Sequence, residues 1–159
     1  MAPRASKFDP YRKFKFRIKI DGKVVAGMTK CSALTISVES QDFRAGDHDG
    51  FKQKLPGQVS FEPITLEQGV TDDKTFENWA TIMSNYVGNK GADAQKKPDE
   101  FRKDIDIEIY NLNNTRVKAY RAYNCWVSKY TPVPDLDANS SDVMIQTLEL
   151  QVEGIQVLQ

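Results

Sequence analysis

The chain has 159 residues, with 22 basic and 22 acidic side chains that cancel and 40% hydrophobic residues. This length fits one compact domain over residues 1–159, and the balanced charge argues against a domain that holds nucleic acid by bulk positive charge. There is no secretory signal pattern and no apolar run of the roughly 18 residues that a membrane-spanning helix needs. We therefore expect synthesis in the cytoplasm and no direct membrane insertion by the monomer.

The first element in chain order is a strand followed by a tight turn. Phenylalanine and isoleucine alternate with lysine and arginine in "FKFRIKI", which is the two-residue period of a half-buried strand. Asp21-Gly22 then has the composition of a two-residue hairpin turn, so we expect a hairpin over 14–27. A second alternating run follows at Leu34, Ile36 and Val38.

A polar stretch over about residues 41–58 lacks a hydrophobic period and contains Gly46, Gly50, Pro56 and Gly57. Long segments without periodicity inside a compact domain are often functional or disordered, and we expect an extended loop here. The next run, "VSFEPITLEQG", predicts a strand in which Pro63 marks an edge position or a bulge.

One helix is predicted over about residues 72–87. The spacing of its large apolar residues is that of a single helical stripe, Phe76, Trp79, Ile82, Met83, Tyr86 and Val87. Thr71, Asp72 and Asp73 supply capping chemistry before the helix, and Gly88 is placed to end it. The stripe could fill a partner's groove, but an amphipathic helix normally covers its own core, which is the interpretation we favour. A surface loop is expected over about residues 89–99.

The remaining elements are strands. Ile105, Ile107 and Ile109 alternate with acidic residues, and a turn at 111–114 leads into two long alternating runs, 117–130 and 143–152. These runs are joined by turn-forming residues over 132–142. Strands on both sides of one helix exclude a regular βαβ alternation. The sequence therefore predicts a mainly β fold, an antiparallel β-sandwich or barrel with one flanking α-helix.

The search for chemistry finds no catalytic constellation. His48, the one histidine, lies between Asp47 and Asp49 in a Gly-flanked segment, where an exposed polar turn is a better explanation than a metal site. Asp104 and Asp106 share a strand face but are better explained as solvated charges than as a general acid and base. Cys31 and Cys125 are expected to be free thiols. We expect no enzyme activity, no cofactor and no metal.

Three segments carry a family resemblance. They are "DPYRKFKFRIKIDGKVVAGMTKCSAL", "KLPGQVSFEPITLEQGVTDDKTFENW" and "PVPDLDANSSDVMIQTLELQVEGI". Together they closely resemble the tail tube proteins of contractile bacteriophages and related contractile injection systems, over nearly the whole chain. The family's fold is shared by the Hcp proteins of type VI secretion. Two segments depart from the family's usual pattern: 89–99 is longer and richer in lysine, and "RAGDHDGFKQ" differs in sequence.

The resemblance implies a structural subunit made in the bacterial cytoplasm. Its copies would form hexameric rings that stack into a hollow tube, which sheath contraction drives through a target envelope while DNA or protein cargo passes. The implied partners are other copies, the sheath protein, the baseplate or spike hub, the tube terminator and the luminal cargo. An Hcp-like ring that carries effectors is the main alternative, and a hydrolase or lectin on a β-sandwich is another.

Assembly of this kind needs at least two different interaction surfaces on each subunit. The segment 41–58 is one candidate, because its charges alternate in sign and its apolar pair offers an anchor. The residues predicted for contact between subunits or rings are Arg44, Asp47, Asp49, Lys52, Lys54, Leu55 and Pro56. Exposed strand edges are the other candidate, because an unpaired edge can pair with the next copy.

Overall fold

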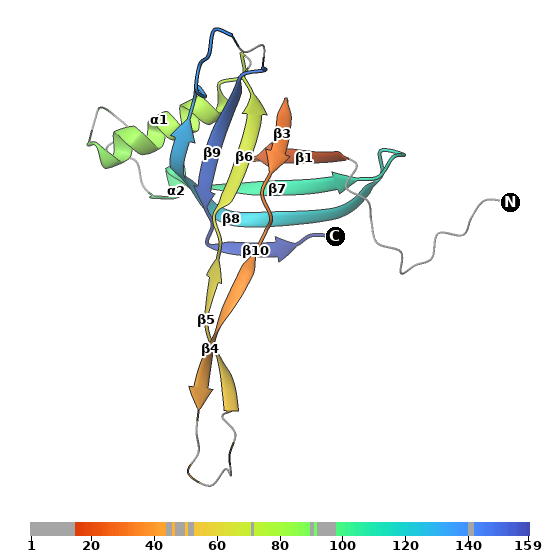
Figure 1. The fold of residues 1–159 in the computed structure, drawn as a ribbon, viewed down its shortest axis with the longest axis vertical. Helices are drawn as coiled ribbons and strands as arrows, with labels where there is room; N and C mark the ends of the chain where they lie inside the picture. Colours follow the sequence, from red (N-terminus) through yellow and green to blue (C-terminus); the bar gives the residue numbers. More distant parts are fainter. Residues whose placement is uncertain are drawn as a thin grey trace, which may run out of the picture.

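Two layers of antiparallel strands, joined by one long strand, form the body of the protein in a computed structural model (Figure 1). The structure describes residues 15–43, 46, 50, 53–70, 72–89, 91, 98–139 and 142–159. The elements in these residues are β1 (Lys15–Ile20), β2 (Lys23–Val25), β3 (Met28–Cys31), β4 (Ile36–Phe43), β5 (Gln53–Phe61), β6 (Ile64–Gly69), α1 (Thr75–Val87), α2 (Pro98–Phe101), β7 (Lys103–Tyr110), β8 (Arg116–Thr131), β9 (Ile145–Gln151) and β10 (Gly154–Val157). The predicted mainly β fold with one clear helix is confirmed.

Strand β8 belongs to both layers. Its first part pairs with β7 and with β10, and its last six residues, from Trp126 onward, pair with β9. Asn124 lies where the strand changes layer and has a positive φ of 51°, a backbone conformation that asparagine tolerates better than most residues. Its backbone N–H donates to the Asp104 carboxylate at 3.0 Å, and its side-chain amide donates to Glu153 at 3.0 Å. These bonds stabilise the bend that separates the layers.

The first layer runs β2–β1–β7–β8 and the second runs β8–β9–β6–β3. The alternation seen in the sequence places one face of each strand in the core, as for Ile18 and Ile20 of β1 or Leu148 and Leu150 of β9, all at most 2% exposed. The predicted first hairpin is confirmed, since β1 and β2 pair across Asp21 and Gly22, whose φ angles of 53° and 80° suit the tight hairpin turn.

Helix α1 packs on this core through most of the predicted stripe, whereas Val87 at its C-terminal end is 76% exposed. Phe76 and Trp79 are fully buried and Met83 is nearly so. The helix begins three residues later than expected. Of the predicted capping residues, Asp73 accepts the backbone N–H of Thr75 at 3.0 Å, and Thr71 lies outside the described residues. Gly88 takes the C-cap position as predicted.

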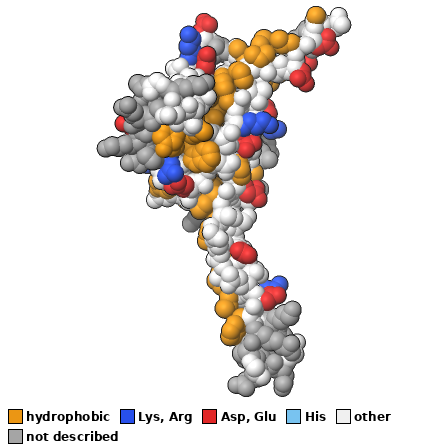
Figure 2. Space-filling model, turned by 90° about the vertical axis from the view of Figure 1, so that its left-hand side faces the viewer, with side chains coloured by type: hydrophobic (Ala, Val, Ile, Leu, Met, Phe, Trp, Pro, Cys, Tyr) orange, Lys and Arg blue, Asp and Glu red, His pale blue; other side chains and the backbone are white. Residues whose placement is uncertain are grey.

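The β4–β5 hairpin extends away from the body as a separate arm (Figures 1 and 2). Its two strands pair only with each other, from Ile36 opposite Phe61 to Phe43 opposite Gln53. The structure therefore differs from the loop expected over 41–58, because the described residues 41–43 and 53–58 belong to these strands. A polar sequence can form a hairpin because the backbone supplies its hydrogen bonds.

Two other segments differ from the structure expected for them. Pro63 separates β5 from β6, so the single strand expected there is two strands that belong to different sheets. Most of the expected surface loop 89–99 lies outside the described residues, and its end forms the short helix α2. No helix in the described part of the chain is long and apolar enough to cross a membrane.

Candidate functional site

The arm carries the most conspicuous unpartnered surface of the described residues. Large apolar side chains that would ordinarily be buried are about half exposed along it: Ile36 54%, Val38 52%, Phe43 49%, Leu55 47% and Val59 51%. Val38 and Val59 face each other across the hairpin. Because an isolated two-stranded hairpin is at best marginally stable in water, an arm with this composition is suited to being covered by another protein surface.

A close backbone approach shapes the arm. The register shifts between Val38 and Ser40, where β4 is opposed by a bulge in β5. A Cβ atom added at Gly57 would lie 3.0 Å from the carbonyl oxygen of Glu39 and 3.2 Å from the Cγ of Gln41. A side chain at this position would push the Glu39 backbone away slightly, so glycine favours the close approach of the two strands. A bulge of this kind also increases the local twist. Gly57 therefore sets the direction in which the outer half of the arm points.

The edges of the two layers offer backbone groups to a further strand. Within the described residues, β2 and β10 lie at the margins of the first layer and β3 at the margin of the second. Val24 on β2 is 55% exposed and Val157 on β10 is 61% exposed. Unpaired edges with apolar side chains are templates for pairing with another chain, so both layers can be extended by strand addition.

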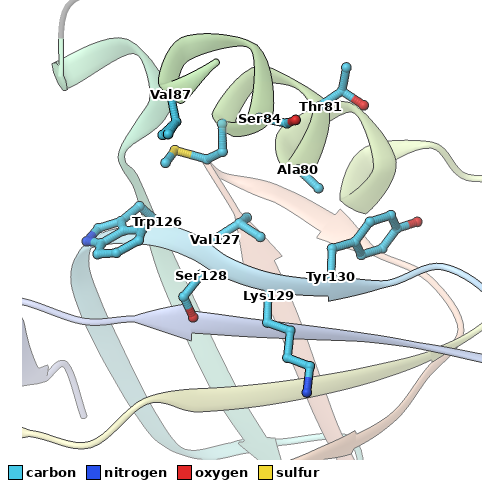
Figure 3. A pocket seen from close by; sticks show the side chains of 10 residues that line it. Ala80, Thr81, Ser84, Val87, Trp126, Val127, Ser128, Lys129 and Tyr130 are labelled. Atoms are coloured by element: carbon cyan, nitrogen blue, oxygen red, sulfur yellow. The ribbon is translucent and has the colours of Figure 1, made fainter.

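A cleft of about 480 Å³ lies between α1 and β8 (Figure 3). Ala80, Met83 and Val87 line it from the helix, and Val127 and Tyr130 line it from the strand. Figure 3 shows the side chains of Ser128 and Lys129 turned away from the helix, so the surface facing the helix is largely apolar. The lining of the cleft therefore offers mainly apolar contacts.

Two charged side chains on the outer face of the first layer are paired with each other. Asp106 on β7 and Arg121 on β8 are opposite each other in register and form two hydrogen bonds of 2.7 and 3.0 Å. These bonds from Arg121 hold the pKa of the Asp106 carboxyl below its ordinary value, although partial burial opposes them. Asp104 accepts the N–H of Asn124 instead. The two aspartates therefore have separate structural partners.

Glu108 is the most buried carboxylate among the described residues, at 3% exposure. Burial raises its pKa, but hydrogen bonds from Lys19 at 2.8 Å and from the Tyr110 hydroxyl outweigh that effect and leave the pKa lowered. Arg116 lies 3.7 Å away, and the guanidinium of Arg17 covers the Tyr110 ring at 4.8 Å from its centroid. The lysine and arginine side chains on the solvent-facing side of β1 are thus part of an ordered layer of ion pairs. The sequence did not predict these pairs, because they depend on strand register.

Three of the seven predicted contact residues, Lys54, Leu55 and Pro56, lie on the described part of the arm. Lys54 is opposite Asp42 in register, and all three side chains are exposed. Arg44, Asp47, Asp49 and Lys52 lie outside the described residues, so the charge alternation proposed for them stays a prediction. Ile36, Val38 and Val59 lie in segments that the sequence predicted as strands, but the sequence analysis did not propose them as contact residues.

The two cysteines and the possible metal ligands are the remaining groups that the sequence raised. Cys31 and Cys125 are free thiols, as predicted, and burial raises their pKa values to about 11 and about 12. Among the described residues, no group of three or more histidine, cysteine, aspartate or glutamate side chains is placed to hold a metal ion. His48, the centre of the metal alternative, lies outside those residues.

Comparison with known proteins gives one family match. The model of the family described as T4-like virus tail tube protein gp19 matches residues 12–156 of this chain. No curated protein matches the chain.

Several solved structures share the fold. A chain in the cryo-EM structure of the PVC sheath/tube terminator, from an extracellular contractile injection system, is 24% identical with a TM-score of 0.75, and the match covers 97% of this chain and 100% of that one. A chain in the PVC sheath-tube complex is 25% identical with a TM-score of 0.69, over 94% of this chain and 93% of that one. Hcp1 from Flavobacterium johnsoniae is 16% identical with a TM-score of 0.57, over 91% of this chain and 95% of that one.

Proposed function

The chain belongs to the family of the T4-like virus tail tube protein gp19, and from this premise we propose that it is a structural subunit of the hollow inner tube of a contractile tail or injection system. Its copies form hexameric rings, and the rings stack into a tube. Contraction of a surrounding sheath drives the tube through a target envelope, and DNA or protein cargo passes through the lumen. The sheath protein, the baseplate or spike hub and the tube terminator are its further partners.

The observation that carries the proposal is the β4–β5 arm. The arm extends from the body, pairs with no other strand, and exposes about half of each of five large apolar side chains. Burying such side chains stabilises an assembly by about 25 cal/mol for each Å² removed from water. A free monomer gains nothing from this surface, whereas a subunit in a stacked array buries it against a neighbouring copy.

Strand edges supply the second kind of contact that a tube requires. A head-to-tail contact that closes produces a ring, and a second, different contact that does not close produces a filament. The margins at β2, β3 and β10 favour lateral pairing within a ring, and the arm, which extends furthest from the body, favours contact between rings. The zero formal net charge also lowers the electrostatic cost of close packing among many copies.

The proposed role is mechanical and uses no catalytic group or cofactor. The carboxylates that sequence reasoning weighed as acid and base, Asp104 and Asp106, each have a structural hydrogen-bond partner. In such a role the charged side chains on β1, β7 and β8 keep these strands in register. They also present a polar surface, to which cargo adheres less than it would to an apolar one. The particle that contains the tube is a phage tail or an injection system, and the solved injection-system chains of the same fold favour a particle of this general kind.

Electron microscopy of the purified full chain at rising concentration tests the proposal. Stacked hollow tubes are expected, and sedimentation should show rings as the smallest assembled species. Isolated rings that never stack would favour the effector-carrying ring module instead. A chain that stays monomeric at millimolar concentration would overturn both. The genes beside this one distinguish a phage, with capsid and terminase neighbours, from an injection system, with an ATPase and toxins.

A further inference from the structure

The connection between β8 and β9 presents an exposed leucine between two carboxylates. Leu136 is 74% exposed, and it lies between Asp135 and Asp137, which are also exposed. We call residues 133–137 the acidic segment. The upper end of the molecule, where Figure 1 places this connection, carries hydrophobic and acidic side chains together in Figure 2. A solitary exposed leucine is ordinary, but Val133 in the same segment is also 46% exposed, so the connection presents apolar and acidic side chains close together.

The acidic segment is held in shape by its own residues. Pro134 has a fixed φ, and the Asp137 carboxylate accepts the backbone N–H of Asn139 at 2.9 Å, which closes a local turn. Within the described part of the chain, neither Asp135 nor Asp137 forms an ion pair. A segment that is already ordered loses less conformational freedom when it binds.

A groove with the complementary chemistry lies between β1, β3 and β7. It has a volume of about 720 Å³, and the side chains that form its apolar floor are Phe16, Leu34, Ile107, Ile109 and Tyr120. Lys15 and Lys30 stand at its margin and are both exposed. Lys15 donates to the Asn114 side chain at 3.0 Å, and no carboxylate among the described residues pairs with either lysine. The groove is thus apolar inside and basic at its rim.

We propose that the acidic segment of one copy binds in this groove of the next copy, with Leu136 on the apolar floor and the two aspartates beside Lys15 and Lys30. Leu136 does not fill the groove of its own chain, since most of its side chain is exposed. A contact between two different surfaces of identical chains is head-to-tail, which is the geometry that a ring requires. The inference rests on the proposed function and names one of its lateral contacts.

The charges favour this occupant over the arm of a neighbouring copy. The described outer half of the arm carries Glu39 and Asp42 but also Lys54, so its charge is mixed, whereas the acidic segment carries only negative charge. Complementary charges orient the approach of two copies, and like charges in the same place would oppose it. The apolar floor then contributes affinity that increased salt does not remove.

Charge exchange is the first test. The loop variant carries Asp135→Lys and Asp137→Lys, the groove variant carries Lys15→Glu and Lys30→Glu, and a third chain carries all four substitutions. We expect each two-site variant to raise the concentration needed for half assembly by about tenfold or more, and the four-site chain to restore it to within about threefold of the parent. All four residues are exposed, and the substitutions remove only the bonds from Lys15 to Asn114 and from Asn139 to Asp137, so thermal unfolding of the monomers should change little. Two-site variants that assemble like the parent, or a four-site chain that is not restored, would overturn the inference.

Cross-linking is the second test and separates this contact from the proposed function. In a Cys31→Ser background, Leu136→Cys with Ala33→Cys should give a ladder of covalent multimers under copper–phenanthroline oxidation, because Ala33 is exposed and lines the groove. Val143→Cys in place of Leu136→Cys is the matched control, as Val143 is 78% exposed and lies at the other end of the same connection.

Tubes without the ladder refute this contact while the proposed function stands. A ladder obtained only when Val59→Cys replaces Leu136→Cys, with Ala33→Cys kept, would show that the arm occupies the groove instead. If the parent chain never assembles, both proposals fail.

Discussion

The indole Nε1 of Trp79 donates a hydrogen bond of 2.8 Å to the backbone carbonyl of Phe101, and this bond ties α1 to the segment that leads into β7. The ring of Phe101 contacts the ring of Tyr86 with centroids 4.6 Å apart, and the ammonium of Lys103 lies 5.7 Å from the centroid of the Trp79 ring. Trp79 itself is fully buried. One side chain thus connects the helix, the core and the start of the first layer.

Trp79→Ala should lower the free energy of unfolding by about 3–5 kcal/mol, because it empties a large core volume and leaves a buried carbonyl without its donor. Trp79→Phe should cost less, because the ring fills part of that volume. Urea unfolding at concentrations where the chain is monomeric measures both. Val87→Ala, at a position that is 76% exposed, is the control and should stay within about 0.5 kcal/mol of the parent. Equal stability of the Ala variant and the parent would contradict this account of the core.

Gly57→Ala should impair assembly while leaving the body stable. The added Cβ would lie 3.0 Å from the Glu39 carbonyl oxygen, so the two strands of the arm must separate or shift. The arm pairs with no strand of the body, so the unfolding temperature of the monomer should hardly change. Gly46→Ala is the matched control, since its Cβ would meet nothing within 4 Å. Sedimentation velocity measures assembly, and an equal effect at both glycines would refute the importance of the close approach.

Val59→Lys should also reduce assembly, for a different reason. Val59 is half exposed in the monomer and faces Val38 on the arm, so a lysine there is tolerated in water but must lose its hydration when a neighbouring copy covers the arm. We expect tube formation to be lost and monomer stability to stay within about 0.5 kcal/mol of the parent. Leu112→Lys, at a 67% exposed position in the turn after β7, is the control. Tubes of the Val59→Lys chain in normal yield would show that the arm stays uncovered.

The ion-pair layer should make stability depend on pH in the acid range. Hydrogen bonds from Arg121 lower the pKa of Asp106 in the folded state, so the folded chain releases this proton more readily than the unfolded chain does. Its contribution is therefore complete above the ordinary carboxyl pKa and disappears as pH falls through the lowered value. Asp106→Asn should destabilise the chain at neutral pH, and the difference from the parent should vanish at the acid end. Arg121→Gln should flatten the same part of the curve, and an unchanged curve would contradict the pairing.

The two thiols should react slowly with iodoacetamide at pH 8. Burial raises the pKa of Cys31 to about 11 and that of Cys125 to about 12, and the thiolate is the reactive form. Cys31 is partly exposed whereas Cys125 is buried, so Cys31 should be modified first. Mass spectrometry of intact protein follows the reaction, with urea-unfolded chain as the control in which both thiols react quickly. Rapid modification of Cys125 in the folded chain would contradict its burial.

Local patterns predicted the elements well where one residue type repeats with a clear period. The alternation of Ile18 and Ile20 with lysine and arginine gives β1 its buried face, and the helical spacing of Phe76, Trp79 and Met83 gives α1 its packing stripe. The turn at Asp21 and Gly22 was also predicted correctly, because few residues tolerate the positive φ that it needs. The outer part of the arm, within 41–58, was wrongly predicted as a loop, because it packs on no core and its polar composition gives no sign of a backbone-paired hairpin.

The order of residues along the chain determined the fold class, the faces of the strands, the turns and the position of the helix. The reason is that the spacing of apolar residues and the steric preferences of turn residues are local features of the chain. The tertiary structure decided the division of β8 between two layers at Asn124, the detachment of the arm, the pairing of Asp106 with Arg121 and the placing of Lys15 and Lys30 beside one groove. Each of these depends on which strands pair and in which register. A shift of one residue moves every side chain to the opposite face, and residues far apart in sequence specify that register together.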